Sequence, residues 1–332
     1  MKLLKAISLI IVGALLFALT SCVSAPTGGD TSAEPSQTAN QIDDQQNNTE
    51  TEQETSADPE SDQSQTEDQS DTETESAAES EGTLADVAVE SHVVFEDSGI
   101  RITVKSLDMN SLFGPELKFL IENDSNEDIE ISANNVVVNG YMFSSYLYTD
   151  VAAGKKANCS VTLSKSDLEE LAIDTVADIE IDFSIYKNDT WDLICKSDLI
   201  SIKTSAAESY LYNYDESGTK IYDDNGVLIV VKGIVKDEFM GDSILVYAYN
   251  TNDVPVTVST RNVSVNGFMI DPWFSCSMLP GKHALSKLSF SETDLEENEI
   301  ESIRDVEITF YIYDTDSWED IAYADPVHLT FD

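Results

Sequence analysis

Few side chains of the 332-residue sequence are of the kinds that act as nucleophiles, general bases or metal ligands. The three histidines and four cysteines form no Gly-x-Ser-x-Gly or His-Glu-x-x-His motif and no ligand-spaced metal motif. Asp and Glu number 63 against 18 Lys and Arg, for a formal net charge of −45. Phosphate binding needs clustered Lys and Arg, so we expect no nucleic-acid partner. We also expect no cofactor and no catalytic activity.

One short acidic segment near the C-terminus has residues suited to a calcium ion. Asp314, Asp316, Glu319 and Asp320 offer several hard oxygen ligands within one turn. They lack EF-hand spacing, and a solvated turn explains the same residues. We therefore expect no metal site, with calcium binding at these four carboxylates as the alternative.

Aromatic residues are the stronger indication of binding. Tyr141, Tyr146 and Tyr148 follow one Asn-Gly pair, and Phe268 and Trp273 follow another. Flat rings beside polar groups suit carbohydrate or peptide surfaces. Alternate residues of a strand face the core, so packing is the alternative explanation for each ring. These five side chains are the candidate ligand contacts.

One cysteine stands at the end of a secretory signal. Lys2 and Lys5 precede an apolar run of about 14 residues, too short to span a bilayer with ease. The run ends in Leu19-Thr20-Ser21-Cys22, which resembles the lipobox of bacterial lipoproteins. The resemblance implies that the signal peptide, residues 1–21, is removed and that Cys22 carries lipid. The mature chain would then be extracytoplasmic and lipid-anchored to the bacterial cell membrane.

Residues 22–91 have the composition of a disordered tether. They are rich in Ser, Thr, Gln, Asp and Glu and contain no Lys or Arg. Such a segment buries too little apolar surface to offset its chain entropy, and its like charges extend it. We expect it to hold the folded part away from the membrane.

The remainder of the chain is an internal duplication. Repeat 1, residues 92–205, aligns without a gap with repeat 2, residues 219–332, so each residue of repeat 1 has its counterpart 127 positions later. The clearest matches are Asn135–Met142 with Asn262–Met269, Asp167–Glu170 with Asp294–Glu297, and Phe183–Trp191 with Phe310–Trp318. Residues 206–218 form the inter-domain linker, whose aromatic segment 210–214 either packs between the repeats or is an ordinary connection.

Each repeat is predicted to be a series of short strands. Ile100, Ile102 and Val104 alternate with polar residues, and Val227, Ile229 and Val231 stand at the matching positions. Further strands are predicted at 116–122, 129–131, 135–138, 157–163, 177–186 and 191–202, and at the matching positions of repeat 2. The sequences starting at Ser164 and Ser291 match a capping box that opens one helical turn. The fold class is therefore all-β, with two tandem β-sandwiches.

The pair of repeats resembles the immunoglobulin-like domains, including the telokin-like group, of largely uncharacterised bacterial lipoproteins. The resemblance rests on Asn-Gly-x-Met, Asp-Leu-Glu-Glu and the final Tyr-x-x-Asp-x-Trp hairpin. It implies a secreted, non-catalytic module. The Cys…Trp…Cys arrangement of antibody domains is absent. Cys159, Cys195 and Cys276 have no cysteine counterparts in the other repeat. Either Cys159 and Cys195 form a disulfide or these cysteines are free buried thiols.

Together these features predict a membrane-anchored lipoprotein that displays two β-sandwich domains for non-catalytic binding at the cell envelope. The ligand would be a protein, a peptide or a glycan. The alternative is a structural spacer or assembly subunit of an envelope complex. A solute-binding component of a transporter is disfavoured, because it would be a larger α/β chain with a cleft between lobes.

Overall fold

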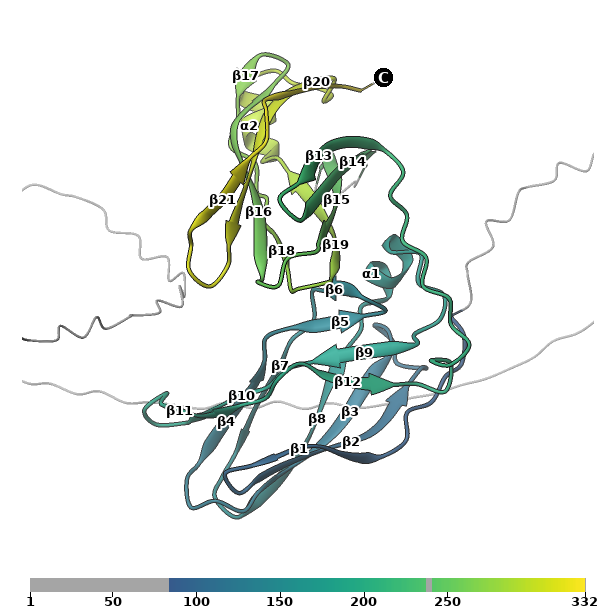
Figure 1. The fold of residues 1–332 in the computed structure, drawn as a ribbon, viewed down its shortest axis with the longest axis vertical. Coiled ribbons are helices and arrows are strands. Elements are labelled where there is room, and N and C mark those ends of the chain that lie inside the picture. The colour runs from purple at the N-terminus through teal and green to yellow at the C-terminus, as the bar shows by residue number, and fades with distance from the viewer. Residues whose placement is uncertain (1–83, 237–240, 332) are drawn as a thin grey trace, which may run out of the picture. The chain divides into compact units, whose positions relative to one another are not determined.

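The computed structural model describes residues 84–236 and 241–331 (Figure 1). The predicted signal peptide, Cys22 and most of the predicted tether lie outside these residues. The described residues all belong to one compact unit. None of the helices within them has the length and apolar content needed to cross a lipid bilayer.

Repeat 1 is built almost entirely of antiparallel strands. One sheet has the order β1-β2-β3-β8, and a second has the order β11-β10-β4-β7. The strands are β1 (His92–Asp97), β2 (Ile100–Asp108), β3 (Glu116–Asn123), β4 (Ile129–Ala133), β5 (Val136–Val138), β6 (Tyr141–Phe143), β7 (Leu147–Val151), β8 (Lys155–Thr162), β9 (Asp178–Ile181), β10 (Ser184–Lys187), β11 (Leu193–Lys196) and β12 (Ile200–Lys203).

Repeat 2 has corresponding elements with fewer interruptions. Its strands are β13 (Thr219–Asp224), β14 (Val227–Val235), β15 (Ser243–Asn250), β16 (Val256–Val265), β17 (Phe268–Met269), β18 (Cys276–Met278), β19 (His283–Ser289), β20 (Asp305–Asp314), β21 (Asp320–Tyr323) and β22 (Val327–Thr330). β16 covers the positions of β4 and β5, and β20 those of β9 and β10. In repeat 1 both are broken where Asp182 accepts hydrogen bonds from the amides of Asn134 and Asn135.

The all-β fold class is confirmed, since the described residues contain only two short helices, α1 (Lys165–Glu170) and α2 (Glu292–Glu297). Both occupy the predicted helical turns. The Ser164 hydroxyl accepts the Asp167 amide at 3.4 Å, as a capping residue does. Ser291, its counterpart, makes no side-chain cap hydrogen bond.

Equivalent asparagines fix the turns of both repeats in the same way. The Asn139 side chain accepts the amides of Ala177 and Asp178, and Asn266 accepts those of Arg304 and Asp305. Each of these asparagines also has a positive φ and precedes a glycine with a positive φ, as expected of a tight Asn-Gly turn.

The predicted C-terminal boundary of the tether, residue 91, is several residues too late. Val87 and Val89 are buried in the core of repeat 1. The Ala85 amide donates to the Asp174 carbonyl at 2.7 Å, and the Ser205 amide donates to the Ala88 carbonyl at 2.8 Å. The segment 84–91 is therefore part of the folded unit, because its apolar residues alternate and find a place against the sandwich.

Candidate functional site

The two repeats meet through a strand pair that joins their sheets. β6 of repeat 1 pairs in parallel with β19 of repeat 2, in register at Tyr141 and His283. The His283 amide donates to the Gly140 carbonyl at 3.0 Å. This pairing creates an eight-stranded sheet in the order β12-β9-β5-β6-β19-β15-β14-β13, in which β6 and β19 are neighbours (Figure 1).

Aromatic rings surround His283 at this junction. The Tyr214 ring, from the linker, stacks on the imidazole with a centroid distance of 3.5 Å, and the Tyr249 ring stacks at 4.0 Å. Tyr141 meets Tyr214 edge to face at 5.3 Å. The Tyr247 hydroxyl lies 2.7 Å from His283 Nδ1, so the two buried polar groups satisfy each other. The linker therefore packs between the repeats.

Burial sets the protonation of this cluster. The His283 side chain is only 5% exposed. Burial, followed by the nearby Lys282 charge, lowers the pKa of His283 to about 4, so the imidazole is neutral at pH 7. Burial also raises the pKa of Tyr214 to about 12. The junction is thus an uncharged aromatic cluster.

Ion pairs flank the aromatic cluster. Lys282 pairs with Glu180, and both side chains are largely buried. Lys287 pairs with Glu170 at 3.1 Å. In each pair the lysine belongs to repeat 2 and the glutamate to repeat 1, so the charges are complementary across the junction.

The surface of repeat 2 that repeat 1 and the linker cover is apolar. Leu228, Val230 and Tyr247 on β14 and β15 are buried and pack with the core residues of repeat 1. Their counterparts in repeat 1 are Arg101, Thr103 and Leu120, of which Arg101 is exposed and the other two are partly exposed. We call this surface of repeat 2 the receiving face: Leu228, Val230, Tyr247, Tyr249, His283 and Leu285.

The predicted role of Tyr141 as a ligand contact is wrong. Its ring is buried against Tyr214 and His283, so no external ligand reaches it. The receiving face was missed, although the sequence carried a signal for it. Val227–Val231 is a continuous apolar run, whereas Ile100–Val104 alternates, and a continuous run is typical of a strand covered on both faces.

A groove on repeat 1 contains another predicted aromatic, Tyr146. Tyr146 is 80% exposed, and Leu112 and Phe113 beside it are 84% and 74% exposed. The rest of the lining is mostly hydroxyl side chains: Ser144, Ser145, Ser160, Thr162, Ser164, Lys165 and Ser166. We call this the hydroxyl groove. Leu112 and Phe113 were not predicted, because their loop has no periodic pattern.

The backbone pairing beside this groove differs from that at the equivalent position of repeat 2. Trp273 is the counterpart of Tyr146, and its backbone exchanges two hydrogen bonds with Ser289, at 2.8 and 3.1 Å. The described backbone hydrogen bonds include none between the equivalent Tyr146 and Thr162. Only the Ser145 hydroxyl reaches the Thr162 carbonyl, at 2.6 Å.

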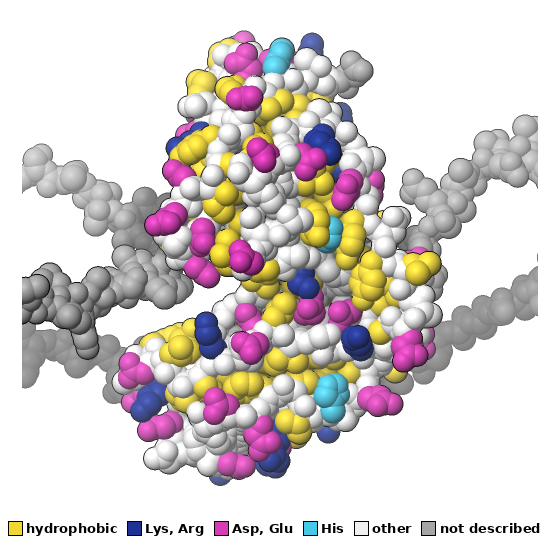
Figure 2. Space-filling model, viewed as in Figure 1, with side chains coloured by type: hydrophobic (Ala, Val, Ile, Leu, Met, Phe, Trp, Pro, Cys, Tyr) yellow, Lys and Arg dark blue, Asp and Glu magenta, His cyan; other side chains and the backbone are white. Residues whose placement is uncertain are grey.

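The remaining predicted aromatics lie on the surface. The Tyr148 hydroxyl donates to Glu130 Oε2 at 2.8 Å. Phe268 and Trp273 are exposed on repeat 2. On the face drawn in Figure 2, acidic side chains are scattered among hydrophobic and neutral ones.

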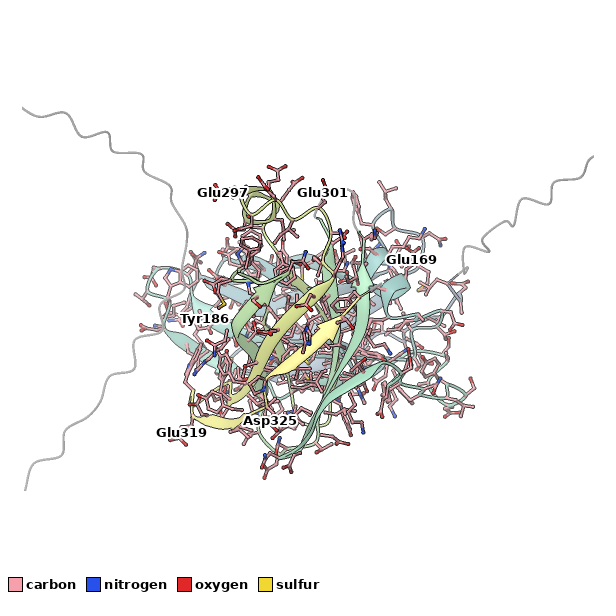
Figure 3. The ribbon with its side chains drawn as sticks, turned by 90° about the horizontal axis from the view of Figure 1, so that it is seen from above. Glu169, Tyr186, Glu297, Glu301, Glu319 and Asp325 are labelled. Carbon is pink, nitrogen blue, oxygen red and sulfur yellow. The ribbon has the colours of Figure 1, made fainter. Side chains whose placement is uncertain are left out.

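The acidic turn after β20 uses its carboxylates locally. Asp314 Oδ1 accepts the amides of Asp316 and Ser317, both at 2.9 Å, and these bonds lower the pKa of Asp314. Asp320 accepts the Tyr323 hydroxyl. Glu319 lies at the end of this turn (Figure 3). The described residues bring together no group of three or more His, Cys, Asp or Glu side chains that could hold a metal ion.

The three cysteines of the repeats are free thiols. Burial raises the pKa of Cys159 and of Cys276 to about 11, so neither is a reactive thiolate at neutral pH. Cys195 is also free and has a raised pKa.

Gly140 and Gly267 give a matched test of the junction. Both have a φ near the left-handed region, +85° and +88°. A Cβ on Gly140 would lie 2.4 Å from the Tyr214 hydroxyl, whereas a Cβ on Gly267 has nothing within 4 Å. Gly140→Ala should lower the free energy of unfolding by roughly 1–3 kcal/mol more than Gly267→Ala, since it alone displaces Tyr214 from Asn139 and His283. Equal losses in chemical denaturation would contradict this role of Tyr214.

The lowered pKa of His283 predicts that the stability of the folded chain depends on pH. Its folded pKa of about 4 is below the usual 6.5, so below pH 6.5 the unfolded chain binds a proton that the folded chain does not. Stability is therefore lost as the pH falls from about 7 to about 4, by about 2 kcal/mol between pH 7.5 and 5.0. His283→Gln should lack this component when denaturation is compared at the two pH values. His328→Gln is the control, because Asp305 raises the pKa of His328 and gives the opposite sign.

Comparison with known proteins yields no family. No family model and no curated protein matches the chain. Among solved structures, the YadV chaperone is 9% identical, with 64% of this chain and 92% of that chain covered and a TM-score of 0.22. The complex of the Salmonella enterica SafA pilin with the SafB chaperone is 10% identical, with coverages of 65% and 89% and a TM-score of 0.20. A protein of unknown function from Porphyromonas gingivalis W83 is 10% identical, with coverages of 65% and 91% and a TM-score of 0.18. These values carry no argument about function.

Proposed function

We propose that the chain is an extracytoplasmic lipoprotein, anchored through Cys22, that binds a peptide or glycan at the cell envelope without catalysis. The observation that carries the binding role is the hydroxyl groove of repeat 1. Leu112, Phe113 and Tyr146 line this groove with large exposed side chains, and Tyr146 makes none of the backbone hydrogen bonds to Thr162 that its counterpart Trp273 makes to Ser289. Exposed apolar side chains gathered in a groove are typical of an interaction site.

The loop that carries Leu112 and Phe113 is held in place by the backbone. Gly114 has a φ of +128°, and a Cβ there would lie 2.0 Å from the Leu163 carbonyl oxygen, so only glycine fits. The Lys165 amide donates to the Phe113 carbonyl at 3.0 Å. The loop is therefore preorganised, which lowers the entropy cost of binding a ligand.

The chemistry of the groove suits an uncharged, hydrogen-bonding ligand. The hydroxyl side chains both donate and accept, and the Tyr146 and Phe113 rings offer flat apolar surfaces. The charged residue that lines it, Lys165, lies 3.5 Å from Glu169, so its charge is partly balanced. A sugar ring or an extended peptide combines the apolar and polar faces that such a groove complements.

Substitution within the groove tests the binding role. Phe113→Ser and Tyr146→Ser should each reduce retention of the solubilised chain on isolated cell wall and on surface-protein extract by about tenfold or more, as loss of an aromatic anchor does. Leu211→Ser is the control, because Leu211 is an apolar linker side chain that is also highly exposed. Equal retention of wild type and both groove variants, or an equal loss in the control, would count against the groove.

Substitution of Cys22 tests the anchor separately. Cys22→Ala removes the thiol that would carry lipid, so the chain should shift from the membrane fraction to the medium or the soluble envelope fraction. Fractionation followed by immunoblotting measures the shift, with Cys195→Ala as the control cysteine substitution. Unchanged membrane retention of Cys22→Ala would remove the lipid anchor from the proposal and leave the groove unaffected.

The alternative, an assembly subunit of an envelope complex, also has an observation in its favour. Repeat 2 exposes Phe268 and Met269, whose counterparts in repeat 1 form the junction between the repeats. Light scattering of the purified chain separates the alternatives for self-assembly, since a stable oligomer favours a structural subunit and a monomer favours display of the groove.

A further inference from the structure

A small set of repeat 1 side chains makes its contact with repeat 2. Tyr141 pairs with His283, and Met142 packs against the core of repeat 2. Glu170 and Glu180 pair with Lys287 and Lys282. We call Tyr141, Met142, Glu170 and Glu180 the docking set of repeat 1. Two apolar side chains at a turn and two flanking carboxylates thus meet an apolar face with two flanking lysines.

Repeat 2 carries the same set at the equivalent positions. The counterparts of these four residues are Phe268, Met269, Glu297 and Glu307, so an aromatic ring, a methionine and both glutamates recur. All four are exposed in repeat 2, and neither glutamate forms an ion pair with a described residue. Phe268 and Met269 are 46% and 68% exposed, whereas Tyr141 is 8% exposed.

The strand register shows that the set has the same geometry in both repeats. In repeat 1, Met142 and Glu180 both pair with Val137. In repeat 2, Met269 and Glu307 both pair with Ser264. The methionine and the glutamate therefore flank one central residue in each case. Glu297 is the last residue of α2 (Figure 3), and Glu170 is the last residue of α1.

Repeat 1 of a second copy offers no suitable partner for this set. The positions equivalent to Leu228, Val230 and Tyr249 of the receiving face are Arg101, Thr103 and Glu122. Arg101 and Lys156 are exposed and paired with Glu96 and Glu122. Burying these charges under Phe268 and Met269 would cost more than the apolar contact contributes. The receiving face of repeat 2 in a second copy is already covered by its own repeat 1.

We propose that Phe268, Met269, Glu297 and Glu307 dock on another protein that presents the outer face of a β-sheet, apolar and aromatic at its centre and flanked by two basic side chains. The partner's chemistry follows from the receiving face, which the equivalent set of repeat 1 already binds. Methionine adapts to an imperfectly matched face, which suits a docking surface. This interface is separate from the hydroxyl groove and does not depend on it.

The chain's own receiving face provides the probe. A full-length chain with Tyr141→Ser, Met142→Ser and Tyr214→Ser frees that face, since Tyr214 also stacks on His283. Phe268→Ser with Met269→Ser in the same chain removes its own second docking set. We call this the acceptor chain. In sedimentation velocity in mild detergent, the wild-type chain should form a 1:1 complex with the acceptor chain, while wild type alone and acceptor chain alone stay monomeric.

Matched variants identify the surface that makes the complex. Phe268→Ser with Met269→Ser in the wild-type partner should abolish it. Glu307→Lys should weaken it by at least about tenfold, and Lys282→Glu in the acceptor chain should restore it, because the charges are then exchanged across the interface. Trp318→Ser, an exposed aromatic substitution on another turn of repeat 2, is the control and should leave binding unchanged.

Three results would overturn the proposal. The first is the absence of a complex when circular dichroism shows that the acceptor chain is folded. The second is a complex that persists when the wild-type partner carries Phe268→Ser with Met269→Ser. The third is self-association of the wild-type chain that this pair of substitutions removes. The last would show that the occupant is a second copy. Should the acceptor chain be unfolded, Glu170→Lys with Glu180→Lys replaces Tyr141→Ser with Met142→Ser, since like charges beside Lys287 and Lys282 open the same face. Loss of groove binding alone leaves this proposal intact.

Discussion

The structure depends on covering the outer face of the second repeat's β13–β14–β15–β19 sheet. Leu228, Val230 and Tyr247 stand on that face and are buried with the core of repeat 1, whereas repeat 2 has a second buried core of its own on the other face of the sheet. His283 lies among them, and its neutral form with the Tyr247 hydroxyl lets one polar pair be buried without a charge. The linker ring of Tyr214 closes the cluster. The repeats are thus joined by a shared set of buried side chains as well as by the linker.

Duplication produced two copies whose inner faces stayed alike while their outer faces diverged. The side chains of Asn139 and Asn266 accept hydrogen bonds from equivalent backbone amides. Phe183 and Phe310 occupy the same fully buried position. The outer face of repeat 1 instead carries ion pairs such as Arg101 with Glu96, which tolerate water. A single framework therefore supports one surface that needs a partner and one that does not.

The sequence predicted those features that depend on local pattern. Alternation located the strands, Asn-Gly pairs located the tight turns, and Ser-x-x-Asp located both helical turns. The prediction was wrong where pattern allows two explanations. Tyr141 is a junction residue because a strand partner from the other repeat covers it, and period-two spacing contains no such information. Leu228 and Val230 were not predicted, because Val227, Ile229 and Val231 alone satisfy the period-two pattern of a strand with one buried face.

The groove residues illustrate a different limit. Leu112 and Phe113 are brought beside Tyr146 by a loop whose course depends on Gly114 meeting the Leu163 carbonyl, which is a contact between segments far apart in sequence. Aromatic content could suggest Tyr146, but only the folded chain shows which rings gather and which stay apart.

The differences between the repeats are complementary. Trp273 of repeat 2 pairs with Ser289, whereas its counterpart Tyr146 lines the hydroxyl groove of repeat 1. Phe268 and Met269 are exposed in repeat 2, whereas their counterparts Tyr141 and Met142 form the junction. Using the first docking set fixes repeat 1, including the loop that carries Phe113, to a second folded body. That attachment limits the motion of the groove, since a rigid junction removes the hinge that a flexible linker would supply. The junction thus holds the hydroxyl groove of repeat 1 firmly and leaves Phe268 and Met269 of repeat 2 exposed.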